Sequence, residues 1–346
     1  MAPKVDPLQL TRELIAIESI TGNEEHATAR IEGALRALGL SVDSQQVAPG
    51  RRNLVATAGP ERPRVLFCTH TDTVPPYVPL SEDDDWIRGR GACDTKGIAA
   101  AMLAAGEKLL ARGFRDFGYL FVVGEETDNA GAKVANRKVH AGQLIVGEPT
   151  EMKVALGHKG VLRVQVTARG QACHSAYPER GDSAIHRLLG GLGRVIAADF
   201  GHSELLGRST VNVGEISGGV AANVLAPHAE AMVMIRVVTS VVAVRRTLEA
   251  CFSDPHTGRM DPQITFASSV DMEPCLLDRV EGYPECVVSY GTDIPHLLEI
   301  GTAGRPVLFG PGSILDAHTD GEKIRKRDIL AAADAYADLA LKLATR

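Results

Sequence analysis

Four short apolar segments, each leading into acidic or histidine side chains, constrain the fold of this chain most. The segments are 65–69, 119–124, 144–147 and 306–310, and after them come His70 and Asp72, Glu125 and Glu126, Glu148, and, beyond a loop rich in glycine and proline, His318. Apolar segments of this length that alternate with helical patterns favour an α/β sheet covered by helices on both faces. Sites in open α/β sheets form beyond the carboxyl ends of the strands. We therefore expect these side chains to meet at one edge of one sheet.

The middle of the chain changes character and predicts a second domain. Further strands are expected at 41–47, 53–57, 161–168, 210–216, 230–238 and 263–267, and helices at 6–18, 24–38, 96–111, 183–198, 242–252 and 329–343, with a polar, turn-rich stretch at 83–90. From residue 160 the order is β-α-β-β-α-β, which is typical of a ferredoxin-like module. The fold class is thus α/β, a mixed sheet flanked by helices, with an inserted α+β ferredoxin-like lid or dimerisation domain. The predicted domains are 1–159 with 269–346, and 160–268.

Composition excludes several classes of function. The net charge is −6 and aromatic residues make up 4% of the 346 positions, which argues against nucleic acid or an anionic membrane as a partner. No segment approaches the ~20 apolar residues that span a bilayer. The first residues lack the apolar stretch of a signal peptide. We therefore expect a cytoplasmic protein.

The candidate ligands point to a pair of divalent metal ions. Asp94 completes the set in the turn at 91–97, just before the expected helix. Imidazole and carboxylate ligands without cysteine suit zinc, manganese or cobalt, and an excess of carboxylates suits two ions that share a carboxylate. Neighbouring side chains at a strand end point apart, so either Glu125 or Glu126 can bind metal while the other acts as general base. A solvated turn is the alternative reading of this acidic pair.

These motifs resemble the M20 family of metallopeptidases. The segments that carry the resemblance are His70-Thr-Asp72, Gly91-Ala-Cys-Asp94-Thr-Lys-Gly97, Glu125-Glu126, Gly147-Glu148-Pro149 and Ala317-His318-Thr319. The family includes acetylornithine deacetylase, succinyl-diaminopimelate desuccinylase, aminoacylases, carboxypeptidases and dipeptidases. The resemblance covers nearly the whole chain. The chain differs from the family between Pro274 and Ser289, where the family usually has a further helix and this chain has only a short linker.

The resemblance implies a role for each residue in the catalytic domain. His70 and Glu148 would bind one metal ion, Glu126 and His318 the other, and Asp94 would bridge the two. Asp72 would orient His70. Glu125 would be the general acid and base. The ions would be zinc, with cobalt or manganese as alternatives.

In the inserted domain the resemblance implies contacts with the substrate. His174 would stabilise the oxyanion, from the partner subunit in dimeric members. Asn223 and Arg236 would contact polar groups of the substrate, including its carboxylate. Outside this domain, the motif Gly291-Thr292-Asp293 would form a loop beside the substrate. The alternatives are a surface-turn role for His174 and, for Arg236, a side chain that extends from its strand towards solvent or pairs with Glu230.

Three hypotheses for the function follow. The first is hydrolysis of N-acyl amino acids by metal-activated water, in a homodimer that binds a small substrate with a free carboxylate. The second is the same chemistry on a dipeptide or a C-terminal residue. The third is a non-catalytic, metal-dependent binding protein, which would require a broken ligand set or the loss of Glu125.

Overall fold

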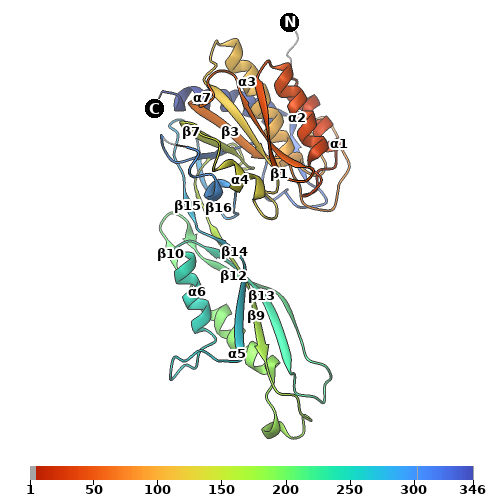
Figure 1. The fold of residues 1–346 in the computed structure, drawn as a ribbon, viewed down its shortest axis with the longest axis vertical. Coiled ribbons are helices and arrows are strands. Elements are labelled where there is room, and N and C mark those ends of the chain that lie inside the picture. Colours follow the sequence, from red (N-terminus) through yellow and green to blue (C-terminus); the bar gives the residue numbers. More distant parts are fainter. Residues whose placement is uncertain (1–4, 302, 346) are drawn as a thin grey trace. The chain divides into compact units, whose positions relative to one another are not determined.

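The computed structural model describes residues 5–301 and 303–345, which form two compact units (Figure 1). The first unit contains the chain up to Leu156, Leu276–Cys286 and the chain from Thr292 onward. The second unit contains Gly157–Cys275 and Val287–Gly291. Within the described residues, no helix is both long and apolar enough to cross a membrane.

A mixed nine-stranded sheet positions the predicted ligands. Its order is β1 (Ser41–Ala48), β2 (Arg51–Thr57), β6 (Phe117–Val122), β3 (Val65–His70), β7 (Gln143–Gly147), β17 (Val307–Phe309), β8 (Val154–His158) and β15 (Cys275–Leu276), with β16 (Glu285–Val288) beside β8. The four adjacent strands β6, β3, β7 and β17 are parallel. They are fully buried and mostly apolar, as expected for parallel strands with both faces covered. Their carboxyl ends therefore lie along one edge.

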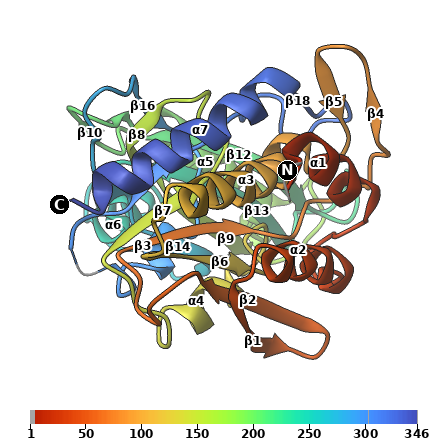
Figure 2. The same ribbon diagram turned by 90° about the horizontal axis from the view of Figure 1, so that it is seen from above.

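Helices cover this sheet, and all of them except the short helix at 130–135 were predicted from the sequence. They are α1 (Pro7–Ala16), α2 (Glu25–Ala37), α3 (Gly97–Ala111), α4 (Ala130–Ala135) and α7 (Lys326–Leu343). α3 and α7 pack side by side against one face (Figure 2). A Cβ atom at Gly106 of α3 would lie 1.8 Å from the Tyr119 hydroxyl, which instead donates to the Met102 carbonyl at 2.9 Å. The close approach of α3 to the sheet therefore requires glycine there.

Several short strands were not foreseen. The turn-rich stretch at 83–90 contains β5 (Trp86–Arg88), which pairs with β4 (Ser81–Glu82) and β18 (Lys323–Arg325). The expected linker between Pro274 and Ser289 contributes β15 and β16. Two- to four-residue strands carry too little periodicity to be recognised, since their partners are distant in the sequence.

The second unit has the predicted ferredoxin-like order. It runs β9 (Gly160–Arg169), α5 (Ala184–Ala197), β12 (Thr210–Gly218), β13 (His228–Val237), α6 (Val241–Ala250) and β14 (Ile264–Met272), with a small ladder of β10 (His202–Ser203) and β11 (Gly207–Arg208). The antiparallel sheet has the order β12-β13-β9-β14. α5 and α6 cover its apolar face (Figure 1). Ser183 and Ser240 cap these helices by accepting hydrogen bonds from their first turns.

Candidate metal centre and active site

The parallel strands bring the predicted ligands together at their carboxyl ends. His70 is the last residue of β3, and Glu148 directly follows β7. Glu126 follows β6 after a turn at Gly124, where φ is +83°. His318 lies in the loop after β17 and has a φ of +61°. A left-handed conformation is uncommon for a residue other than glycine and occurs often at functional sites.

The ligands form two groups that share Asp94. One group is His70, Asp94 and Glu148, and the other is Asp94, Glu126 and His318; the ligand atoms in each lie within 4.8 Å of one another. His70 Nε2 is 3.1 Å from Asp94 Oδ1, and His318 Nε2 is 3.3 Å from Asp94 Oδ2. Each carboxylate oxygen of Asp94 therefore faces a different histidine. This arrangement suits a carboxylate that bridges two ions.

The ring of His70 is held in the tautomer that a metal ligand needs. Its Nδ1 lies 2.9 Å from the main-chain carbonyl oxygen of Asp72, and a carbonyl can only accept a hydrogen bond. The proton of a neutral His70 is therefore on Nδ1, which leaves the lone pair of Nε2 directed at the ligand group. The predicted orientation of His70 by Asp72 acts mainly through this carbonyl, since the Asp72 carboxylate is 3.5 Å away.

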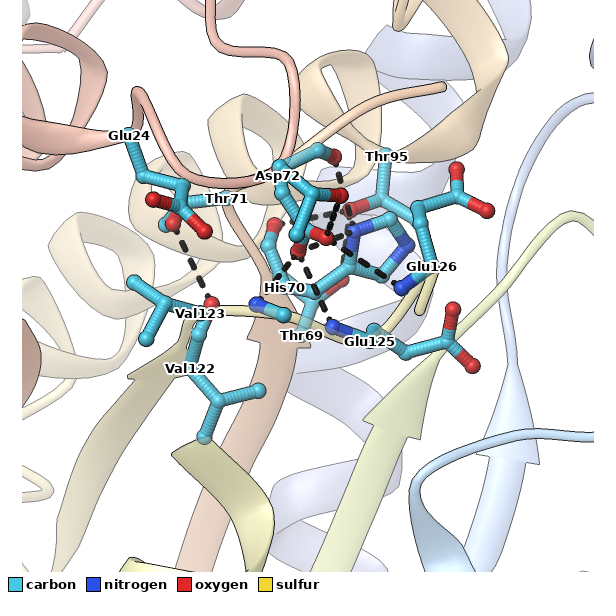
Figure 3. Close-up of polar contacts among 12 residues, drawn as sticks. Glu24, Thr69, His70, Thr71, Asp72, Thr95, Val122, Val123, Glu125 and Glu126 are labelled. Carbon is cyan, nitrogen blue, oxygen red and sulfur yellow. Dashed lines mark hydrogen bonds and ion pairs between the residues drawn. The ribbon is translucent and has the colours of Figure 1, made fainter. Parts of the chain in front are cut away.

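The carboxylate of Asp72 instead organises the turn that carries Glu125 and Glu126 (Figure 3). Its Oδ1 accepts from the main-chain N–H groups of Gly124 and Glu125 at 3.0 and 3.1 Å. Its Oδ2 accepts from the N–H of Glu126 at 3.2 Å and from the Thr21 hydroxyl at 2.7 Å. Burial raises the pKa of Asp72, but the nearby His70 and the hydrogen bond from Thr21 outweigh it and keep this pKa below the ordinary value. A charged Asp72 holds the turn in place through these main-chain contacts.

The charges at the centre fit divalent cations. Burial and then the charge of Asp94 raise the pKa of Glu148 well above its ordinary value, and the same causes raise that of Glu126. Hydrogen bonds to Asp94 and Glu126 raise the pKa of His318 to about 10. Among residues 5–301 and 303–345, no lysine or arginine forms an ion pair with Asp94, Glu126 or Glu148. Clustered carboxylates without a lysine or arginine partner are expected to bind cations.

Glu125 lies beside the ligand groups without belonging to either. Burial is the largest cause that raises its pKa well above the ordinary value, followed by the charge of Glu148. Asn129 holds the turn by donating to the Glu125 carbonyl at 3.3 Å and to Asp293 Oδ1 at 3.0 Å. Burial raises the pKa of Asp293 to about 7. Asp293 belongs to the Gly291-Thr292-Asp293 motif, from which only Thr292 was predicted to lie at the site.

Thr292 is fully buried in the first unit. Its hydroxyl oxygen accepts a hydrogen bond from the main-chain N–H of Ile294 at 3.1 Å. This contact orders the loop that carries Asp293.

His174 and Asn223 lie together in the second unit. The Ser175 N–H donates to the Asn223 carbonyl at 2.9 Å, and His174 forms a bridge with Val224. The main-chain N–H of Ala176 donates to His174 Nδ1 at 3.1 Å. In a neutral ring the proton is therefore on Nε2, so this exposed histidine presents an N–H donor to its surroundings.

Arg236 lies at the other end of the same sheet. It pairs with Val161 near the start of β9, whereas Asn223 is in the loop before β13. From Ala229 to Arg236 the strand advances seven residues, or about 24 Å at ~3.4 Å per residue. The alternative ion pair with Glu230 does not form, since Glu230 contacts Gln165 and Ser217. In the described part of the chain, Arg236 has no ion-pair partner, and burial lowers its pKa.

Comparison with known proteins places the chain in a family. Residues 156–256 match the model of a peptidase dimerisation domain. A "Peptidase M20 domain-containing protein" of Schizosaccharomyces pombe is 38% identical over 95% of this chain and 82% of its own length. A "Probable carboxypeptidase" of Aspergillus flavus is 36% identical over 96% of this chain and 86% of its own length. The chain therefore belongs to the M20 family of peptidases.

Solved structures share the fold. A tripeptidase from Staphylococcus aureus superposes with a TM-score of 0.80 and 21% identity, covering 98% of both chains. Human carnosine dipeptidase 1 superposes with a TM-score of 0.72 and 18% identity, covering 98% of this chain and 96% of its own. The predictions of the family, of the α/β fold with its additional domain and of a metal-dependent amide hydrolase are confirmed.

Proposed function

We propose that this protein is a two-metal hydrolase that cleaves an amide bond next to a free carboxylate in a small substrate. The observation that carries the proposal is the shared position of Asp94, whose two oxygens face His70 and His318 from separate ligand groups. His70, Asp94 and Glu148 would hold one ion, and Asp94, Glu126 and His318 the other. Zinc suits these nitrogen and oxygen ligands, as do cobalt and manganese.

The remaining side chains would carry the proton and position the substrate. When bound, two divalent ions polarise a carbonyl and lower the pKa of water. Glu125 takes a proton from the attacking water and delivers it to the nitrogen of the leaving amine. His174 Nε2–H donates to the oxygen on which negative charge develops, and Asn223 binds a polar group of the substrate. Arg236, which has no carboxylate partner in the described chain, binds the free carboxylate of the substrate.

A peptide is the substrate that the relatives favour. The relative from Aspergillus flavus is named a probable carboxypeptidase, and the structural neighbours include a tripeptidase and a dipeptidase. Hydrolysis of a dipeptide or of a C-terminal peptide bond thus takes precedence over the first hypothesis from the sequence. Deacylation of N-acyl amino acids, which needs the same centre and carboxylate contact, stays a prediction.

A side-by-side assay decides between these substrates. Zinc-loaded protein should release amino acids from dipeptides and blocked dipeptides with a higher kcat/KM than from acetyl- and succinyl-amino acids with the same C-terminal residue. C-terminal amides of those peptides should react poorly, since they lack the carboxylate that Arg236 would bind. Equal turnover of acids and amides would contradict the carboxylate requirement, and faster turnover of the acylated amino acids would restore the deacylase hypothesis.

We also propose that the protein acts as a homodimer. The matched domain is named for dimerisation. Within it, β12 is an edge strand with an exposed Ile216, and α5 exposes Leu189 and Ile196. His174 and Asn223 lie far along the sheet from Arg236, so contributions from two subunits to one site are consistent with the geometry. The cytoplasmic location expected from the sequence likewise stays a prediction.

Mixed dimers test this arrangement. The variants His174→Ala and Glu125→Gln should each lose nearly all activity, at ~10²-fold or more. If His174 acts across the dimer, each mixed dimer formed by subunit exchange should have up to half the activity of a normal dimer, because one of its two sites then has both residues. Exchange is verified with differently tagged subunits. No recovery in verified mixed dimers would mean that His174 acts within its own chain or not at all.

A further inference from the structure

Arg90 and Glu322 form a buried ion pair next to the ligand groups, in contact with the main chain of Asp94 and of Thr319. Each residue is 1% exposed, and Arg90 Nη1 is 2.8 Å from Glu322 Oε2. Neither residue belongs to a ligand group. Burying two charges is costly, and an apolar pair of similar volume is often as stable. If the Arg90–Glu322 pair has a role beyond stability, that role comes from the hydrogen bonds that these two charged side chains make with neighbouring segments.

The carboxylate of Glu322 contacts the main chain of the shared ligand. Its Oε1 accepts from the N–H of Cys93 at 3.2 Å and from the N–H of Asp94 at 3.3 Å. These two hydrogen bonds fix the turn from which the Asp94 side chain extends. Because Glu322 follows 228 positions after Asp94, the contact ties together segments that the local sequence leaves independent.

The guanidinium of Arg90 contacts the loop that carries His318. Its Nη1 donates to the Thr319 carbonyl at 3.2 Å, and its Nε donates to the Pro76 carbonyl at 3.0 Å. Thr319 directly follows His318, whose main chain is in the left-handed region. The pair therefore holds the main chain of Asp94 and that of Thr319, the neighbour of His318, at a place where no long strand supports either ligand.

We infer that the Arg90–Glu322 pair is a positioning device for the ion held by Asp94, Glu126 and His318. The other ion shares Asp94, but its remaining two ligands, His70 and Glu148, lie at the ends of the buried strands β3 and β7, which hold them in place without the pair. The inference rests on the metal centre proposed above. It goes beyond that centre by predicting that the two ions depend unequally on a residue that touches neither.

The test measures the affinity and stoichiometry of zinc binding to metal-free protein. It compares the variant Glu322→Gln with the unmodified protein and with the control variant Glu82→Gln. Glu82 pairs with Arg12 and Lys326 at the surface, so it serves as the matched control. We expect two ions per chain in the unmodified protein and in the control. In Glu322→Gln one ion should bind as before and the second ~10–100-fold more weakly, the usual effect of disturbing a residue behind a ligand. The visible spectrum of the Co²⁺-loaded protein should change with the second equivalent only.

Glu322→Asp keeps the charge but shortens the side chain, and it should weaken the binding of the same ion. This variant replaces Glu322→Gln if circular dichroism shows that the glutamine variant does not fold. Two ions bound with unchanged affinity and spectrum in a folded variant would overturn the positioning role and leave the metal centre intact. Equal weakening of both ions would also overturn it. Fewer than two ions in the unmodified protein would instead overturn the centre itself.

Discussion

Replacing Glu125 with glutamine is expected to lower kcat by at least ~10²-fold, the usual contribution of a general base, while both metal ions stay bound. Glutamine has the size of glutamate but cannot take up a proton at neutral pH. The turn should keep its shape, because Asp72 binds the main-chain N–H of Glu125 and not its side chain. The measurement is kcat together with the metal content per chain by atomic emission.

Glu126→Gln is the matched comparison, because it changes the neighbouring residue in the same way. Glu126 lies 3.1 Å from His318 Nε2 and belongs to a ligand group, so this variant should lose affinity for one ion. The opposite pattern, with metal lost from Glu125→Gln and retained by Glu126→Gln, would mean that the two roles are exchanged.

Replacing Asp94 with asparagine is expected to affect both ions and to reduce activity at least as much as Glu125→Gln. Asparagine has one amide oxygen and no charge, so it cannot offer an anionic oxygen to each side. The matched variants Glu148→Gln and His318→Ala each remove a ligand from one group only, and each should weaken a single ion. Metal titration by calorimetry separates these cases. Two tightly bound ions in Asp94→Asn would exclude a bridging role.

The edge of the parallel sheet could be predicted from the sequence because it depends on a short-range pattern. Each apolar strand ends next to its functional side chain, as at His70 and Glu148, and parallel strands bring those ends together. The resemblance to the family then supplied the pairing of ligands, which spacing alone left open. Both steps use information that lies within a few residues of each ligand.

The supports behind the ligands could not be predicted in this way. Asp72 reaches the turn that carries Glu125 across 53 positions, and Glu322 reaches Asp94 across 228. Such contacts depend on how the loops pack after folding, and the acidic residues that make them have no distinctive neighbours. The pairing of β5 with β18 could not be predicted either, because the two strands are distant in the sequence and three-residue strands show no clear periodicity.

The second unit shows a different limit. Its β-α-β-β-α-β order was readable because β9 and β13 alternate regularly between buried and half-buried positions. The positions of its functional residues could not be predicted. His174 and Asn223 come together through a loop bridge, whereas Arg236 lies at the opposite end of β13. Sequence spacing does not reveal that separation.

Reversible removal of metal is the decisive experiment for a two-metal hydrolase. Protein dialysed against a strong chelator should be inactive on every peptide and N-acyl amino acid that the loaded protein cleaves. Titration with Zn²⁺ or Co²⁺ should restore activity and reach its maximum at two ions per chain, as the ligand groups around Asp94 predict. Full activity in protein shown to be free of metal would contradict the account.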